Sequence, residues 1–124
     1  AHFLPPPSLS PSILSVGTWE DRERFPSKQT TSVGQPDLWA HGENIISVLS
    51  PNYNFSLQNR SKSSIVDHSY IAMSGASMAT PMVSGMAACL LERFPNLTPS
   101  QVKQRLCAAA EKNGGLLEPS CLPE

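Results

Sequence analysis

The sequence has no strong charge of either sign and no long apolar run. Its 124 residues include 9 Lys and Arg against 10 Asp and Glu, which gives a formal net charge of −1 at pH 7. The absence of a basic run argues against nucleic-acid binding, and no acidic tail is present. No apolar stretch reaches the roughly 20 residues that a membrane-spanning helix requires. The sequence therefore predicts neither a nucleic-acid-binding protein nor a membrane-spanning chain.

Cysteine is also scarce. The chain has only Cys89, Cys107 and Cys121, which are too few and too irregularly spaced for a disulfide framework. Cys89 lies in an apolar run and is predicted to be a buried thiol. A bridge between Cys107 and Cys121 is left open, because an odd number of cysteines argues neither for it nor against it. The cysteines do not identify the compartment.

The start of the chain lacks an initiator Met and lacks the basic start and apolar core of a signal peptide. Residues 1–11 are rich in proline, which favours an extended segment without sheet pairing. We interpret this segment as a plain surface connection, and the alternative is a docking site for a proline-recognition module. The start predicts that the chain begins inside a longer gene product.

Short apolar runs predict strands at residues 12–19, 45–49 and 70–73. The polar residues 20–36 are predicted to be loop, and residues 52–68, rich in Ser and Asn, are predicted to be a long exposed loop. Buried strands without alternation indicate a parallel sheet covered on both faces. Such a sheet needs more strands than this chain offers, so the sequence predicts the end of a larger α/β domain.

Two helices are predicted in the second half of the chain. Residues 78–94 are nearly all small or apolar, which predicts a helix buried on most sides, with Pro81 close to its start. Residues 98–101 (TPSQ) supply a capping threonine, a proline at the first helical position and a glutamine three residues on. A lysine and a glycine within residues 112–114 end this second helix. Residues 116–124 are predicted to be a tail without organisation.

Ser77 lies between small residues in the segment SGASMATPMVSG, residues 74–85. A serine hydroxyl becomes a nucleophile only when a base removes its proton and the developing oxyanion is stabilised. The start of a helix supplies unpaired N–H groups and partial positive charge for that purpose. Serine is also a favoured helix cap, so the residues alone leave two interpretations of Ser77 open, and local preference favours the cap.

Residues 74–81, followed by Val83 and Gly85, resemble the nucleophile segment of the subtilisin-like serine proteases, the subtilases. The family pattern there is Gly-Thr-Ser-Met-Ala-x-Pro-x-Val-x-Gly, and the change in this sequence is Ala76 in place of threonine. The match covers eight consecutive positions with that single mild change. This resemblance favours Ser77 as the nucleophile over Ser77 as a cap.

The flanking segments resemble subtilase segments in the same order. Residues 12–19 (SILSVGTW) resemble the family's strand that ends in Val-Gly-Ala. Residues 37–47 (DLWAHGENIIS) resemble its Asp-x-x-Ala-Pro-Gly-x-x-Ile-x-Ser segment, with His41 in place of the proline. Residues 94–106 (FPNLTPSQVKQRL) resemble the helix after the nucleophile helix. The resemblance therefore extends from residue 12 to about residue 114.

The resemblance implies that residues 1–124 are the C-terminal part of one subtilase catalytic domain. Its fold class would be α/β, with a parallel, doubly covered sheet and the nucleophile at a helix N-terminus. Ser77 would be the catalytic residue and its backbone N–H one oxyanion donor. By the same resemblance, a substrate cleft would be lined by Met73, Ser74, Gly75 and Ala76.

The other catalytic motifs of the family lie earlier in its domain, where the triad order is Asp, then His, then Ser. The resemblance implies that an N-terminal portion of the same domain supplies the Asp, the His and the oxyanion Asn. The histidines of this chain, His2, His41 and His68, lack the family context and are predicted to be solvated. Asp37 matches a family position of structural character, and the remaining aspartates have no triad context.

The functional hypothesis is a serine endopeptidase that hydrolyses peptide bonds in proteins or peptides through an acyl-enzyme, and this chain alone is predicted to be inactive. The alternative is an inactive subtilase homologue that acts as a binding or regulatory protein, which the changes at Ala76 and His41 permit. The sequence shows no recognisable set of metal ligands, although the resemblance to subtilases is compatible with a bound calcium ion. The resemblance also favours the secretory pathway, where Asn54, Asn59 and Asn96 would be glycosylation acceptors.

Overall fold

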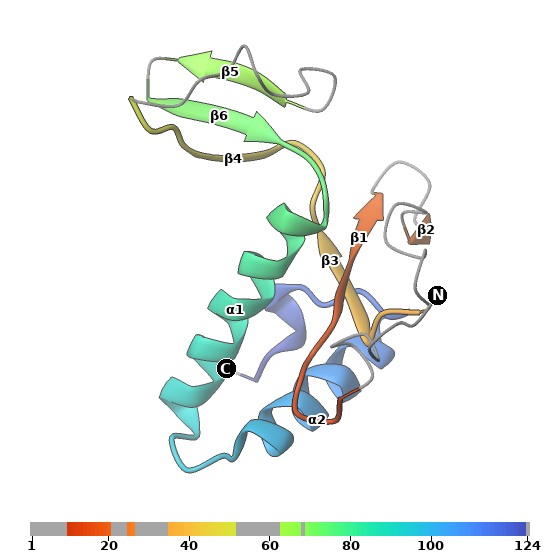
Figure 1. The fold of residues 1–124 in the computed structure, drawn as a ribbon. Helices are drawn as coiled ribbons and strands as arrows, with labels where there is room; N and C mark the ends of the chain where they lie inside the picture. Colours follow the sequence, from red (N-terminus) through yellow and green to blue (C-terminus); the bar gives the residue numbers. More distant parts are fainter. Residues whose placement is uncertain (1–9, 21–24, 27–34, 52–62, 68, 124) are drawn as a thin grey trace, which may run out of the picture.

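The computed structural model describes residues 10–20, 25–26, 35–51, 63–67 and 69–123, and Figure 1 shows the chain. The elements in chain order are β1 (Val16–Glu20), β2 (Phe25–Pro26), β3 (Leu38–His41), β4 (Ile45–Val48), β5 (Ser63–Asp67), β6 (Tyr70–Met73), α1 (Ala76–Arg93), α2 (Pro99–Glu111) and a short 3₁₀ turn, Pro119–Cys121. Most of the proline-rich residues 1–11, the acceptors Asn54 and Asn59, and the histidines His2 and His68 lie outside the described residues.

The strands form two small three-stranded sheets. In the first, β1 lies between β2 and β3 and pairs in parallel with β3, with Val16 opposite Leu38 and Trp19 opposite His41. In the second, β6 pairs antiparallel with β4 on one side and with β5 on the other. Figure 1 shows this second sheet beyond the N-terminal end of α1. The parallel β1–β3 pair next to two helices agrees with the predicted α/β class.

The core forms where both helices meet β3. Helix α1 buries residues at intervals of three and four, which places them in one stripe along the helix. The members of the core cluster are Leu38, Ala40, Ala79, Val83, Met86, Leu90, Leu106, Ala110 and Leu117. Helix α2 has the predicted capping box: Thr98 Oγ1 accepts from the Gln101 N–H, and Gln101 Oε1 accepts from the Thr98 N–H.

Two segments that the sequence predicts to be irregular are ordered. Strand β5 occupies part of the predicted loop 52–68, because its backbone pairs with β6 whatever the polarity of its side chains. The first residues of the predicted tail 116–124 instead lie alongside β3 and are hydrogen-bonded to it. Trp39 donates its N–H to the Gly115 oxygen and accepts from the Leu117 N–H, each at 2.8 Å, and Leu116 and Leu117 are fully buried. These residues complete the core that the two helices leave open.

The structure contradicts one cysteine prediction and decides the question that the sequence left open. Cys89 is exposed rather than buried, because it lies on α1 away from the stripe that packs on the sheet. Cys107 and Cys121 are both free thiols, so the bridge left open by the sequence is not formed. Burial raises the pKa of the Cys107 thiol, with a further increase from Asp37 that Lys103 opposes.

Candidate active site

Ser77 is exposed at the junction between β6 and α1. Helix α1 begins at Ala76, two residues earlier than predicted, so Ser77 is the second residue of the helix. The N-cap is Gly75, which has φ 134° and ψ 174° and makes no side-chain capping bond. The interpretation of Ser77 as the helix cap is therefore wrong, since the capping position belongs to a glycine.

The junction is held by a second segment of the chain. The Gly75 N–H donates to the Gly42 carbonyl oxygen at 2.8 Å, and the Asn44 N–H donates to Ser74 Oγ at 2.9 Å. Gly42 is tightly packed, since a Cβ built there would lie 2.8 Å from the Gly75 oxygen. Asn44 adopts the left-handed region at φ 52°, which asparagine tolerates better than most residues. These two bonds fix the backbone that leads to Ser77.

The sequence did not predict Gly42 and Asn44 as positioning residues. Gly42 belongs to the predicted turn after β3, but nothing in the local pattern relates that turn to a segment more than 30 residues later. The local signal is that Gly42 and Asn44, on either side of Glu43, are both residues that favour turns. The positioning role of Gly42 and Asn44 is visible only in the folded structure, where the ends of β3 and β6 lie next to each other.

Ser77 lies in the first turn of α1, where the Met78 and Ala79 N–H groups both donate to the Gly75 carbonyl oxygen, at 2.9 and 3.2 Å. The first N–H groups of a helix have no carbonyl one turn earlier, and the helix dipole adds partial positive charge there. Pro81 is the sixth residue of α1 and carries no N–H, so the Ser77 carbonyl cannot receive the usual helical bond from it. Thr80 Oγ1 donates to the Ala76 oxygen at 2.9 Å. The positive end of the α1 dipole can stabilise negative charge beside the serine hydroxyl.

The four residues predicted to line a substrate cleft, Met73, Ser74, Gly75 and Ala76, form one half-buried path from β6 into α1. Met73 also lines an apolar cavity of about 360 Å³ between β4, β6 and the start of α1. Met78, the residue after Ser77, contributes to the same cavity. An apolar hollow thus adjoins the candidate nucleophile.

His41 is not simply solvated. It ends β3, and its Nε2 lies 2.9 Å from Glu118 Oε1, with both side chains about 30% exposed. Asp37 has the structural role that the sequence predicts: its Oδ2 accepts from the Ser15 N–H at 2.8 Å and from Ser15 Oγ at 3.1 Å. Neither contact belongs to a catalytic triad around Ser77.

The described residues also bear on metal binding and on membrane insertion. In the part of the chain that the structure describes, no group of three or more His, Cys, Asp and Glu side chains could hold a metal ion. None of the described helices is both long and apolar enough to cross a membrane. Asn96 is exposed at the turn between α1 and α2.

The fold and this junction define a class: an α/β protein that presents an exposed serine where a strand passes into a helix. The subtilase family model matches residues 5–120, and the chain belongs to that family. Serine protease AprX of Bacillus subtilis (strain 168) is 40% identical over 119 residues, covering 86% of this chain and 26% of AprX. The Arabidopsis thaliana subtilisin-like protease SBT3.9 is 35% identical over 96 residues, covering 77% of this chain and 11% of the plant protein.

A solved structure shows the same fold. Fervidolysin from Fervidobacterium pennivorans, described as a keratinolytic enzyme related to subtilisin, superposes with a TM-score of 0.66 at 21% identity. The match covers 94% of this chain and 19% of fervidolysin. The subtilisin-like α/β fold expected from the sequence is thereby confirmed. The chain spans about a quarter or less of the length of these relatives.

Proposed function

We propose that this chain is the C-terminal part of a subtilase catalytic domain and carries the nucleophile of a serine endopeptidase, Ser77. The observation that carries the proposal is the exposed Ser77 hydroxyl at the second position of α1, within a segment that matches the family's nucleophile motif. The membership of the chain in the subtilase family supports a peptidase. The substrate would be a peptide bond in a protein or peptide.

In this proposal a histidine of the N-terminal portion takes the proton of the Ser77 hydroxyl as the oxygen attacks the peptide carbonyl carbon. The carbonyl oxygen becomes an oxyanion, stabilised by the Ser77 N–H and by an asparagine of the N-terminal portion. The histidine then gives the proton to the leaving amine, and an ester to Ser77 remains. Water, deprotonated by the same histidine, attacks the ester and releases the acid. An aspartate of the N-terminal portion orients the histidine throughout.

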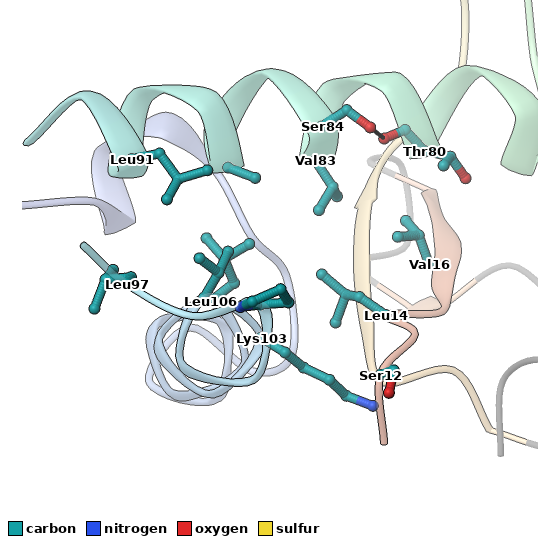
Figure 2. A pocket seen from close by; sticks show the side chains of 13 residues that line it. Ser12, Leu14, Val16, Thr80, Val83, Ser84, Leu91, Leu97, Lys103 and Leu106 are labelled. Carbon is teal, nitrogen blue, oxygen red and sulfur yellow. Dashed lines mark hydrogen bonds between the residues drawn. The ribbon is translucent and has the colours of Figure 1, made fainter. Parts of the chain in front are cut away.

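Two apolar surfaces support the presence of an N-terminal portion. On one face of α1, Met82 is 37% exposed, and Cys89, seven residues later, is exposed as well, while Leu91 lies on the opposite side and lines the second surface. An apolar cavity of about 370 Å³ also lies between α1, α2 and the segment that leads into β1, as Figure 2 shows. A helix that is apolar on all sides is stable when it is covered on all sides. We therefore assign both surfaces to contact with the N-terminal portion, and we call the two parts together the assembled enzyme.

The reactivity of the Cys89 thiol tests the proposed contact between α1 and the N-terminal portion. In the assembled enzyme the thiol is expected to react with a water-soluble maleimide at least tenfold more slowly than in the isolated chain, because the N-terminal portion would exclude the reagent. Peptide mapping by mass spectrometry measures the rate at Cys89 separately from the other thiols. A Ser100→Cys variant, exposed on α2, provides a control that should react equally fast in both forms. Equal reactivity of Cys89 in both forms would contradict the proposed contact.

A serine-reactive fluorophosphonate tests the nucleophile itself. The probe is expected to label Ser77 in the assembled enzyme and to label the isolated chain far more slowly, since the base is then absent. Ser77→Ala should abolish labelling, while Ser100→Ala should leave it unchanged. Ser100 is a matched control because it is also an exposed serine at the second position of a helix, α2.

The same experiment distinguishes the alternative hypothesis. An inactive homologue that binds or regulates other proteins would assemble and protect Cys89 but would leave Ser77 unlabelled. Labelling of the isolated chain at the rate of the assembled enzyme would instead contradict the division of the site between two portions.

A further inference from the structure

The segment after α2 runs beside β3 and reaches the last residue of that strand. Trp39 and Leu116 form a parallel bridge, and two backbone bonds of 2.8 Å join Trp39 to the residues on either side of Leu116. In parallel pairing, residues two positions further along each chain lie side by side on the same face. His41 is two positions beyond Trp39, and Glu118 is two positions beyond Leu116. The register therefore brings these two side chains together.

The His41 and Glu118 side chains form a hydrogen bond. His41 Nε2 lies 2.9 Å from Glu118 Oε1, and each side chain is 30% exposed, so the bond is partly shielded from water. An ionised carboxylate only accepts hydrogen bonds, so the imidazole donates through its Nε2–H. Glu118 also comes directly before the 3₁₀ turn Pro119–Cys121, which begins with a proline of fixed φ. The carboxylate therefore holds the His41 ring from a backbone with little freedom of its own.

His41 comes one residue before the glycine that holds the nucleophile junction. The Gly42 carbonyl oxygen accepts from the Gly75 N–H at 2.8 Å, and Gly75 is the N-cap of α1, two residues before Ser77. A Cβ built at Gly42 would lie 2.8 Å from the Gly75 oxygen, so the two segments are in close contact. Movement of His41 would therefore shift Gly42 and, through it, the backbone that leads to Ser77.

We propose that Glu118 is a positioning residue for the Ser77 nucleophile and acts through His41 and Gly42. In the subtilase pattern the position of His41 is a proline, whose ring fixes φ without any partner. In this chain the side-chain pair supplies the restraint, from a residue 77 positions later in the sequence. The inference rests on the proposed catalytic role of Ser77, but its effect on the Gly75 N–H can be measured without any catalysis.

Glu118→Ala in the assembled enzyme is expected to lower kcat about tenfold with little change in KM, because a displacement of about 1 Å costs about 100-fold and the loosened junction should shift by less. Glu118→Gln should keep kcat within about threefold of the wild type, since its amide oxygen can accept the same bond. His41→Ala should match Glu118→Ala, and the double variant should lose no more than either, because the two residues act as one unit. Steady-state hydrolysis of a chromogenic peptide measures these values.

Asn113→Ala is the matched control. Asn113 Nδ2 donates to the Leu116 carbonyl oxygen at 3.0 Å, so this variant loosens the same segment by removing a bond that does not involve His41. Its melting temperature should fall about as much as that of Glu118→Ala, while its kcat should stay at the wild-type value. Equal losses of kcat in Asn113→Ala and Glu118→Ala would mean that general destabilisation explains both, and would overturn the inference.

Hydrogen exchange followed by NMR distinguishes failure of this inference from failure of the proposed function. The Gly75 amide should exchange about fivefold faster in Glu118→Ala and His41→Ala, and at the wild-type rate in Glu118→Gln and Asn113→Ala. An unchanged Gly75 rate in Glu118→Ala would overturn the inference whether or not the enzyme is active. Faster exchange together with an inactive wild type would support the link from Glu118 to the junction and contradict only the catalytic role of Ser77. If Glu118→Ala does not fold, His41→Ala decides by the same criteria.

Discussion

Ser77→Ala is expected to lower the kcat of the assembled enzyme by on the order of 10⁶-fold, with little change in KM. The size of the effect follows because removing the serine of a catalytic triad costs about as much as removing the whole triad. The remaining rate would come from the oxyanion hole and from substrate binding. Hydrolysis of a chromogenic peptide, followed at several substrate concentrations, measures kcat and KM separately.

The specificity of that loss is established by Ser100→Ala, which places the same substitution at the same position of the other helix. It should keep the wild-type kcat, because Ser100 lies at the start of α2 and not at the β6–α1 junction. The proposed role of Ser77 fails if the Ser77→Ala variant keeps a rate within tenfold of the wild type.

Gly75→Ala is expected to lower kcat by about 100-fold and the free energy of unfolding by about 1–3 kcal/mol. Gly75 adopts φ 134° and ψ 174°, a region of backbone conformation that residues with a Cβ rarely adopt. A Cβ built there meets no atom within 4 Å, so the expected cost is backbone strain and not a clash. Relief of that strain would move the Gly75 backbone and displace Ser77, and a displacement of about 1 Å costs about 100-fold in rate. Urea denaturation and steady-state kinetics measure the two effects.

Gly114→Ala is the control that separates the effect of backbone strain on stability from the effect of displacing Ser77 on kcat. Gly114 also has a positive φ, 71°, and open space around its Cβ position, but it follows α2 and does not contact the junction. It should lose about 1 kcal/mol of stability and keep the wild-type kcat. Equal losses of kcat in both glycine variants would show that destabilisation alone explains the effect of Gly75→Ala.

The parts of the fold that the sequence predicts correctly depend on local signals. Strand β6 has the predicted bounds, and α2 begins with the capping box that residues 98–101 spell out. Strands β1 and β4 coincide with predicted apolar runs, although their ends differ by up to four residues. Hydrophobic periodicity and helix capping depend on residues that are close together in the chain. Both can therefore be recognised from the sequence alone.

The features that the sequence does not predict depend on residues far apart in the chain. Strand β3 has only four residues and is not predicted by the local pattern, which indicates a turn at its end, and β5 is identified only by its pairing with β6. Lys103 reaches a carbonyl 90 residues earlier, and Gly42 bonds to Gly75. Such contacts follow from how the elements pack, which no local pattern records.

For the candidate site, the motif alone directs attention to Ser77, and the structure adds how its backbone is held. The four cleft residues and the catalytic role of Ser77 stay predictions that the experiments above address. The exposed position of Cys89 was missed for a physical reason: an apolar helix predicts burial, but the surface that would bury this face is not among the described residues.

Strand β3 has a consequence for engineering the protein. Asp37, before the strand, has its Oδ2 3.5 Å from Lys103 Nζ, and Gly42, after it, holds the nucleophile junction. At about 3.3 Å per residue, the two positions lie roughly 17 Å apart along the strand. Substitutions at distant sites with no shared partners usually have additive effects. Thermal tolerance could therefore be selected at the amino end of β3, by varying the groups around residue 103, without disturbing the chemistry at its other end.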